Sequence, residues 1–189
     1  DPTEVCICAG AWSNDVLPQS VQLPNKPIKG QYVRLQGPPL IQNVIRTPDV
    51  YIIPRHNGEL YIGASVEDQG FNTDLLAGHA MELLYHAWRA IPGTFEMKIV
   101  EHGIGFRPSL RDNLPAIGRT AIEGLSVATG HYRHGIMLAP ITARLMAQQL
   151  AGDSPASAEA FSPMRFSPKP ETVYGYQITN RTYFRGCMP

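Results

Sequence analysis

The pattern of apolar and polar positions is clearest between residues 125 and 150. An apolar run at 125–128 leads into Gly130, and a basic, aromatic segment lies between Gly130 and Gly135. Apolar residues then recur with helical spacing over 136–150. This pattern predicts a strand, a tight turn and a helix. The first N–H groups of such a helix have no acceptor within it, so the turn favours an anionic or electron-rich group.

The middle third of the chain predicts an antiparallel sheet with one helix. Residues 49–55 and 60–66 are apolar segments on either side of Asn57-Gly58, which is a strong hairpin signal. Thr73 is a plausible N-cap for a helix over 73–90 that has one apolar face. Further strands are predicted at 27–35 and 97–106.

A second continuous apolar run, residues 5–9, ends at Gly10 and is typical of a strand buried on both faces. Ala9 and Gly10 would let a ligand approach the backbone, although a plain strand-to-helix turn explains them equally well. Cys6 and Cys8 are interpreted as small core residues rather than as a metal or redox pair. The odd number of cysteines favours a reducing, cytosolic compartment.

Charge and composition exclude several classes of function. The chain has 16 basic and 16 acidic residues, and this zero net charge argues against a general nucleic-acid or anionic-membrane binder. No apolar run reaches the roughly 18–20 residues that a membrane span needs. His79 and His86 lie on the predicted helix without a third ligand, so we predict no metal site.

The candidates for chemistry are arginines at the ends of apolar strands. Arg55, Arg107 and Arg133 occupy such positions, and Arg107 stands directly before Pro108. An arginine there can hold a carboxylate with two parallel hydrogen bonds. Tyr51 could add its phenolic O–H to the same anion. For each arginine, a surface ion pair is the alternative interpretation.

Seven short motifs occur in an order that resembles the C-terminal part of the D-amino-acid-oxidase-type flavoproteins, with the glycine oxidases of thiamine biosynthesis as the most similar group. The motifs are AGAWS at 9–13, PIKGQ at 27–31, VYIIPR at 50–55, IGASVED at 62–68, GFRP at 105–108, LPAIG at 114–118 and ATGHYRHGIMLAP at 128–140. Each is weak alone, but the ordered set is specific and covers about residues 4–166.

The resemblance implies FAD as the cofactor and assigns roles to these residues. Arg107 would bind the substrate carboxylate with help from Tyr51, and Arg133 would close the substrate pocket. Ala9 and Gly10 would lie against the cofactor. No side chain would act as an acid or base. The turn that would wrap the isoalloxazine end of FAD comprises Gly130, His131, Tyr132, Arg133, His134, Gly135, Ile136 and Met137.

The same resemblance implies a cytoplasmic enzyme that deaminates glycine or a small amine by hydride transfer to flavin, with release of hydrogen peroxide, in thiamine (thiazole) biosynthesis. It also implies a homo-oligomer for the full-length enzyme. The fold class expected is α+β: a mixed or antiparallel sheet with flanking helices, plus the C-terminal part of an FAD-binding α/β domain. Residues 1–25 and 109–166 would belong to the FAD-binding domain, 26–108 to the substrate domain and 167–189 to an irregular tail.

One feature of these flavoproteins is missing from the sequence. No Gly-x-Gly-x-x-Gly turn, which would hold the FAD pyrophosphate, occurs in the 189 residues. We therefore expect the chain to be a portion of a longer flavoprotein and to be inactive alone. A non-catalytic binding or interaction module derived from the oxidase fold is the alternative.

Overall fold

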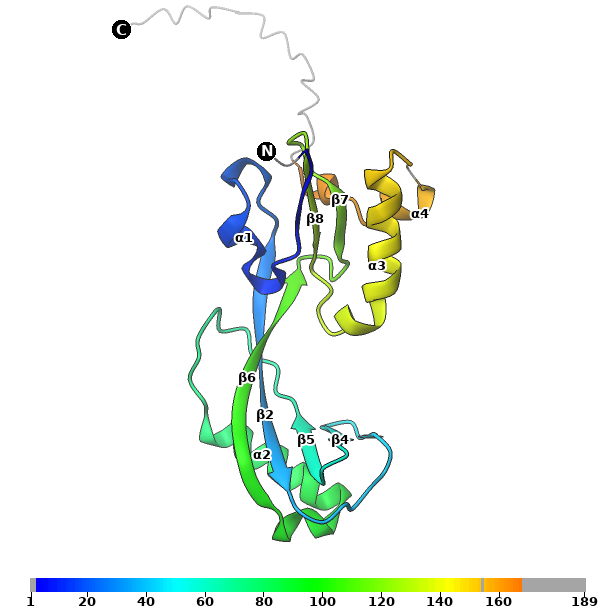
Figure 1. The fold of residues 1–189 in the computed structure, drawn as a ribbon. Coiled ribbons are helices and arrows are strands. Elements are labelled where there is room, and N and C mark those ends of the chain that lie inside the picture. Colours follow the sequence, from blue (N-terminus) through cyan, green and yellow to red (C-terminus); the bar gives the residue numbers. More distant parts are fainter. Residues whose placement is uncertain (1–2, 154, 168–189) are drawn as a thin grey trace, which may run out of the picture.

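Two long antiparallel strands, β2 (Asn25–Gln36) and β6 (Lys98–Leu110), connect the two lobes of the fold (Figure 1). The structure is a computed structural model, and it describes residues 3–153 and 155–167. The two strands pair from Asn25 opposite Leu110 to Gln36 opposite Lys98, with one irregularity between Arg34 and Leu35. Because both strands run through both lobes, residues from the two sheets meet near the middle of the molecule.

The lower lobe in Figure 1 contains a five-stranded antiparallel sheet with strand order β3-β4-β5-β2-β6. Asn57 and Gly58 connect two of its strands, which confirms the predicted hairpin. One face packs on α2 (Ala77–Ala90), and the buried core between them includes Val33, Leu35, Ile52, Leu60, Ile62, Leu83 and Ala87. The remaining elements of this lobe are β3 (Ile45–Arg46), β4 (Tyr51–Pro54), β5 (Glu59–Gly63) and the 3-10 helix η3 (Pro92–Glu96).

The predicted helix is present as α2 and ends at residue 90 as expected, but it begins four residues later than predicted, and the prediction of Thr73 as its N-cap is wrong. Its N-cap is Leu76, without a side-chain cap. The backbone N–H of Leu76 donates to Gln31 Oε1 at 2.9 Å, and the carbonyl of Asp74 accepts from Lys29 Nζ at 2.9 Å. These bonds to buried polar side chains of β2 hold the segment before the helix outside the helical conformation.

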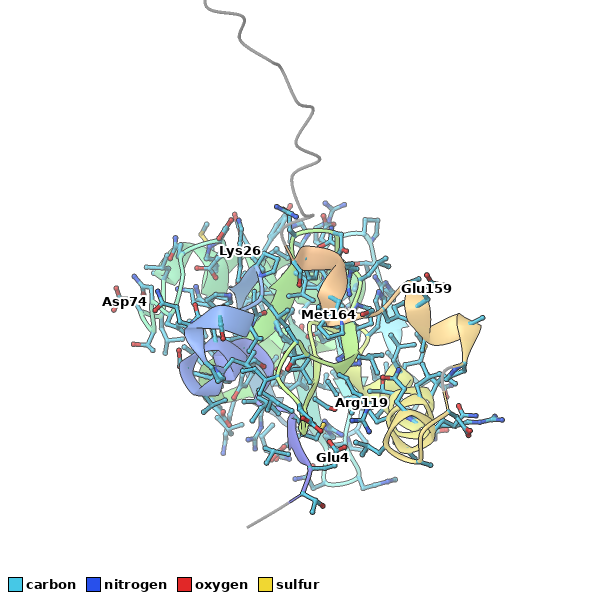
Figure 2. All side chains as sticks on the ribbon, turned by 90° about the horizontal axis from the view of Figure 1, so that it is seen from above. Glu4, Lys26, Asp74, Arg119, Glu159 and Met164 are labelled. Atoms are coloured by element: carbon cyan, nitrogen blue, oxygen red, sulfur yellow. The ribbon has the colours of Figure 1, made fainter. Side chains whose placement is uncertain are left out.

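The upper lobe contains a three-stranded mixed sheet with order β1-β8-β7. Strands β1 and β8 are parallel, whereas β7 and β8 are antiparallel. Glu4 and Arg119, both labelled in Figure 2, form an ion pair of 2.9 Å across this sheet. The elements are β1 (Val5–Ile7), β7 (Ala116–Arg119), β8 (Leu125–Thr129), α1 (Ser13–Val16), α3 (Gly135–Leu150), α4 (Ala156–Glu159), and the 3-10 helices η1 (Gly10–Trp12), η2 (Gln19–Val21) and η4 (Pro163–Phe166).

Strand β1 is not buried on both faces, and this prediction is wrong. Val5, Cys6 and Cys8 are all exposed, because β1 lies at the edge of its sheet and pairs only with β8. The two cysteines are therefore not core residues, and their Sγ atoms lie 3.6 Å apart. Partial burial and the neighbouring Cys8 raise the pKa of the Cys6 thiol to about 11.

The predicted α+β class, with antiparallel and mixed sheets and flanking helices, is confirmed. The strand, turn and helix predicted over 125–150 are also confirmed, as β8 and α3. The predicted tail at 167–189 lies, apart from Ser167, outside the described residues. None of the described helices is long and apolar enough to span a membrane.

Candidate functional site

The face of the five-stranded sheet opposite α2 combines glycines, tyrosines and two arginines. Side chains alternate along a strand, so Tyr32 and Arg34 point away from the helix-packed Val33 and Leu35. Cross-strand pairing puts the matching residues of β4, β5 and β6 beside them. We call this surface the open face; it comprises Gly30, Tyr32, Arg34, Tyr51, Tyr61, Gly63, Gly103 and Arg107.

Arg107 is anchored on the open face by two backbone carbonyls. Its Nη1 donates to the carbonyl oxygen of Ser65 at 3.1 Å and to that of Lys29 at 3.4 Å. Its guanidinium lies over Gly30, where no side chain stands in the way. Within residues 3–153 and 155–167, Nη2 and Nε of Arg107 have no hydrogen-bond acceptor. Arg107 therefore keeps N–H donors from which a carboxylate could accept hydrogen bonds.

The tyrosines form a stacked row next to this arginine. The rings of Tyr51 and Tyr61 are 6.3 Å apart and nearly parallel, and those of Tyr61 and Tyr32 are 4.6 Å apart. Tyr51 covers Gly63, two residues from the Ser65 carbonyl that binds Arg107. Burial raises the pKa of Tyr61, so this phenol stays protonated. The structure therefore brings the predicted substrate residues Tyr51 and Arg107 to the same short segment.

The predicted turn at 130–134 lies against β6, directly after Arg107. The N–H of Tyr132 donates to the carbonyl of Pro108 at 2.8 Å, and His131 forms a β-bridge with Ser109. His131 Nε2 lies 2.9 Å from Thr142 Oγ1, and burial lowers the pKa of this imidazole. The turn is thus attached to the strand that carries the candidate carboxylate ligand.

The N-terminus of α3 presents unpaired N–H donors beside exposed apolar side chains. Its N-cap, His134, provides no side-chain cap, and the N–H groups of the first helical turn have no acceptor within the helix. Ile136 is 96% exposed and Met137 is 71% exposed, so apolar side chains stand beside these donors. Free N–H groups next to apolar surface suit a flat, apolar ring with an electron-rich edge. The other predicted member, Arg133, is exposed, and its guanidinium lies 5.3 Å from the ring of Tyr132.

The remaining predicted residues lie at two separate places. Gly10 joins the end of β8, because its carbonyl accepts from Thr129 Oγ1 at 2.9 Å, and Ala9 precedes it. Gly10 has a φ of 56° and open space where a Cβ would lie. Arg55, by contrast, lies in the hairpin turn, at the opposite end of β4 from Tyr51. No three His, Cys, Asp or Glu side chains in the described parts of the chain could hold a metal ion together.

Several residues of the open face were not singled out from the sequence. Tyr61 and Gly63 alternate on β5, and Gly30 sits in the PIKGQ motif, but no local pattern indicates that they meet. The pairing of β2 with β5 and β6 brings them together. A strand that places glycines and aromatic residues on its solvent-facing positions is the one signal that could have indicated this surface.

Comparison with known proteins places the chain in a class of flavoproteins. Residues 2–149 match the family model described as DAO: FAD dependent oxidoreductase. The chain belongs to this family, whose cofactor is FAD.

Its relatives include proteins named glycine oxidase. The chain is 40% identical over 146 residues to the bifunctional protein ThiO/ThiG of Nostoc sp., covering 75% of this chain and 22% of that protein. It is 34% identical over 155 residues to the glycine oxidase of Pseudomonas aeruginosa, covering 80% and 43%. The crystal structure of glycine oxidase from Geobacillus kaustophilus superposes with a TM-score of 0.79 at 34% identity, covering 86% and 45%. The chain thus spans less than half the length of these relatives.

Proposed function

We propose that this chain forms the substrate-binding side of an FAD-dependent amino-acid oxidase that deaminates glycine or a similarly small amine. The observation that carries the proposal is the guanidinium of Arg107, which is held by the carbonyls of Lys29 and Ser65 and keeps further N–H donors. Membership in the FAD-dependent family and similarity to proteins named glycine oxidase support this choice of chemistry.

In this proposal, Arg107 binds the substrate carboxylate through two parallel hydrogen bonds, and Tyr51 donates its phenolic O–H to the same group. Fixing the carboxylate orients the amine and the α-carbon, which is the contribution that the chain makes to the reaction. The N–H groups of Gly135, Ile136 and Met137 would hold the electron-rich edge of FAD. When bound, FAD supplies the acceptor for the hydride that leaves the α-carbon.

Finer assignments belong to the same proposal. Ala9, Gly10 and the turn at 130–134 contact the cofactor, and Arg133 closes the substrate pocket. Residues 1–25 and 109–166 form part of the FAD-binding domain, and 26–108 form the substrate domain. The two electrons removed from the substrate reduce oxygen to hydrogen peroxide. The enzyme acts in thiamine (thiazole) biosynthesis, and it is a cytoplasmic homo-oligomer. We expect no turnover from residues 1–189 alone, because their sequence has no Gly-x-Gly-x-x-Gly turn.

The test is glycine-dependent formation of hydrogen peroxide by the intact protein, meaning the longer flavoprotein of which residues 1–189 are expected to be a portion. It is combined with titration of acetate as an unreactive carboxylate. Arg107→Lys should raise the KM for glycine and the Kd for acetate by about tenfold or more, since a bond to a charged group contributes about 1.5–3 kcal/mol. Arg55→Lys, the same change at the hairpin, should alter neither constant. If Arg107→Lys leaves the Kd for acetate unchanged and the wild type forms no peroxide from glycine, the non-catalytic module is favoured instead.

A further inference from the structure

A buried ion pair lies on the other side of the sheet from the guanidinium of Arg107. Lys29 Nζ and Glu67 Oε2 are 3.0 Å apart, and their side chains are 0% and 3% exposed. Lys29 Nζ also donates to the carbonyl of Asp74 at 2.9 Å. Removing both charges from water is unfavourable by several kcal/mol each, so the pair persists only because other groups satisfy it.

Three further side chains complete this network around the Glu67 carboxylate. Gln31 Nε2 donates to its Oε1 at 2.9 Å, and the hydroxyl of Ser65 donates to the same oxygen at 2.5 Å. His79 Nε2 lies 3.6 Å from Oε2. Four side chains from β2, α2 and the segment after β5 therefore converge on one carboxylate.

The backbone of the same residues forms a short ladder. Lys29 and Glu67 exchange two N–H···O bonds of 2.9 Å, and the N–H of Ser65 donates to the carbonyl of Gln31 at 3.2 Å. Two sets of contacts therefore attach the segment 65–67 to β2. One consists of backbone hydrogen bonds, and the other consists of the contacts that the Glu67 carboxylate makes with side chains of β2.

The two carbonyls that anchor Arg107 belong to Lys29 and Ser65. Both residues also bind the Glu67 carboxylate with their side chains. A single buried carboxylate thus fixes, from beneath the sheet, both backbone positions that hold the guanidinium above it. No other described residue binds the side chains of both anchors.

We propose that Glu67 is a positioning residue for Arg107: its carboxylate holds Lys29 and Ser65 so that their carbonyls orient the guanidinium toward a substrate carboxylate. This inference rests on the proposed function, because it assumes that Arg107 binds that carboxylate. Glu67 itself touches no substrate and acts only through the anchors. Its loss therefore weakens carboxylate binding while the chemical step at saturating substrate stays nearly unchanged.

The experiment is a double-mutant cycle in the intact protein, read by calorimetric titration with acetate. Glu67→Gln should raise the Kd of acetate by about tenfold, because a misplaced guanidinium loses part of a charge-assisted bond. The same change in an Arg107→Lys background should have almost no effect. Asp68→Asn is the matched control: the same chemical change one residue away, in an exposed ion pair with Lys26, should leave the Kd unchanged. With glycine, Glu67→Gln should raise KM and spare kcat.

Each outcome decides a separate question. An equal loss in both backgrounds would show that Glu67 does not act through Arg107, and the inference would be overturned. If Glu67→Gln has no effect while Arg107→Lys weakens acetate binding, the inference fails and the proposed function stands. If Arg107→Lys has no effect, the proposed function fails. Should Glu67→Gln not fold, Ser65→Ala removes one bond to the carboxylate and keeps the backbone carbonyl, and the same cycle applies to it.

Discussion

The guanidinium of Arg107 lies directly over Gly30: a Cβ built at Gly30 would be 2.3 Å from Nη2 and 2.6 Å from Cζ. A glycine at this position therefore lets the arginine lie close to the sheet, where it reaches the carbonyls of Lys29 and Ser65. Gly105, which pairs with Gly30 across β2 and β6, has no atom within 4 Å of such a Cβ. The two paired glycines thus differ in what they make room for.

Gly30→Ala should displace the arginine and weaken substrate binding. The methyl group would collide with the end of a flexible side chain, so the fold should tolerate it while the guanidinium moves. We expect the KM for glycine and the Kd for acetate to rise by roughly tenfold, which is the range of one lost charge-assisted bond. Gly105→Ala is the control and should leave both constants unchanged. Similar effects of the two substitutions would mean that the contact with Arg107 is irrelevant to binding.

Tyr51→Phe tests the second proposed ligand of the carboxylate. The substitution keeps the ring over Gly63 and its stacking on Tyr61, and removes only the hydroxyl. Loss of one hydrogen bond of about 1–2 kcal/mol should raise the Kd of acetate roughly 5-fold to 30-fold. Tyr85→Phe, on the exposed surface of α2, provides a control for the loss of a phenol. Acetate titration of both variants measures the effect. If Tyr51→Phe and Tyr85→Phe have the same Kd for acetate, Tyr51 does not bind the carboxylate.

Local signals were sufficient for much of the fold. Asn57-Gly58 specifies its hairpin through residues that are neighbours in sequence, and Gly130 and Gly135 mark the turn between β8 and α3. The predictions were wrong where residues far apart in the sequence determine the local structure. The start of α2 depends on bonds from Lys29 and Gln31 of β2, more than 40 residues away, to the segment before the helix.

The candidate site divides in the same way. Arg107 and Tyr51 could be selected from the sequence, because each belongs to an apolar strand and carries a side chain that can bind a carboxylate. The prediction that Arg107 ends its strand was wrong, since β6 continues to Leu110. Their anchors could not, because the meeting of Gly30, Ser65 and Arg107 depends on strand register. Strand β1 shows the same limit: its composition is that of a buried strand, but exposure is set by which strands lie next to it.

Gly130→Ala should destabilise the turn before α3 for two separable reasons. Gly130 has a φ of 80°, and a Cβ there would lie 2.5 Å from Leu110 Cδ1. Gly152 has a φ of 95° but no atom within 4 Å, so Gly152→Ala measures backbone strain alone. We expect about 1–2 kcal/mol for the strain and roughly 1–3 kcal/mol more at Gly130 from overpacking. Urea unfolding of both variants gives the comparison, and equal losses would show that Leu110 moves aside freely.

The buried Glu67 carboxylate should make stability depend on pH in a defined window. Burial by itself raises its pKa, but hydrogen bonds from Ser65, Gln31 and Lys29, with the charge of His79, outweigh this effect and bring the pKa below its ordinary value of 4.5. A carboxyl whose pKa is depressed on folding stabilises the protein fully above the unfolded pKa, and this contribution disappears as the pH falls through the folded pKa. Glu67→Gln removes the group and leaves Lys29 buried without its charge partner, which should lower the free energy of unfolding by roughly 3–5 kcal/mol at neutral pH.

The measurement is urea unfolding of the wild type and of Glu67→Gln at a series of pH values. The difference between them should be constant above about pH 5 and should shrink below pH 4.5, as the wild-type carboxyl takes up its proton. Asp68→Asn, the exposed neighbour, should show little difference from the wild type at any pH. A difference between wild type and Glu67→Gln that stays the same from pH 6 to pH 3 would mean that the loss comes from placing an amide N–H among the donors of Gln31, Ser65 and Lys29, and that the charge of Glu67 does not stabilise the fold.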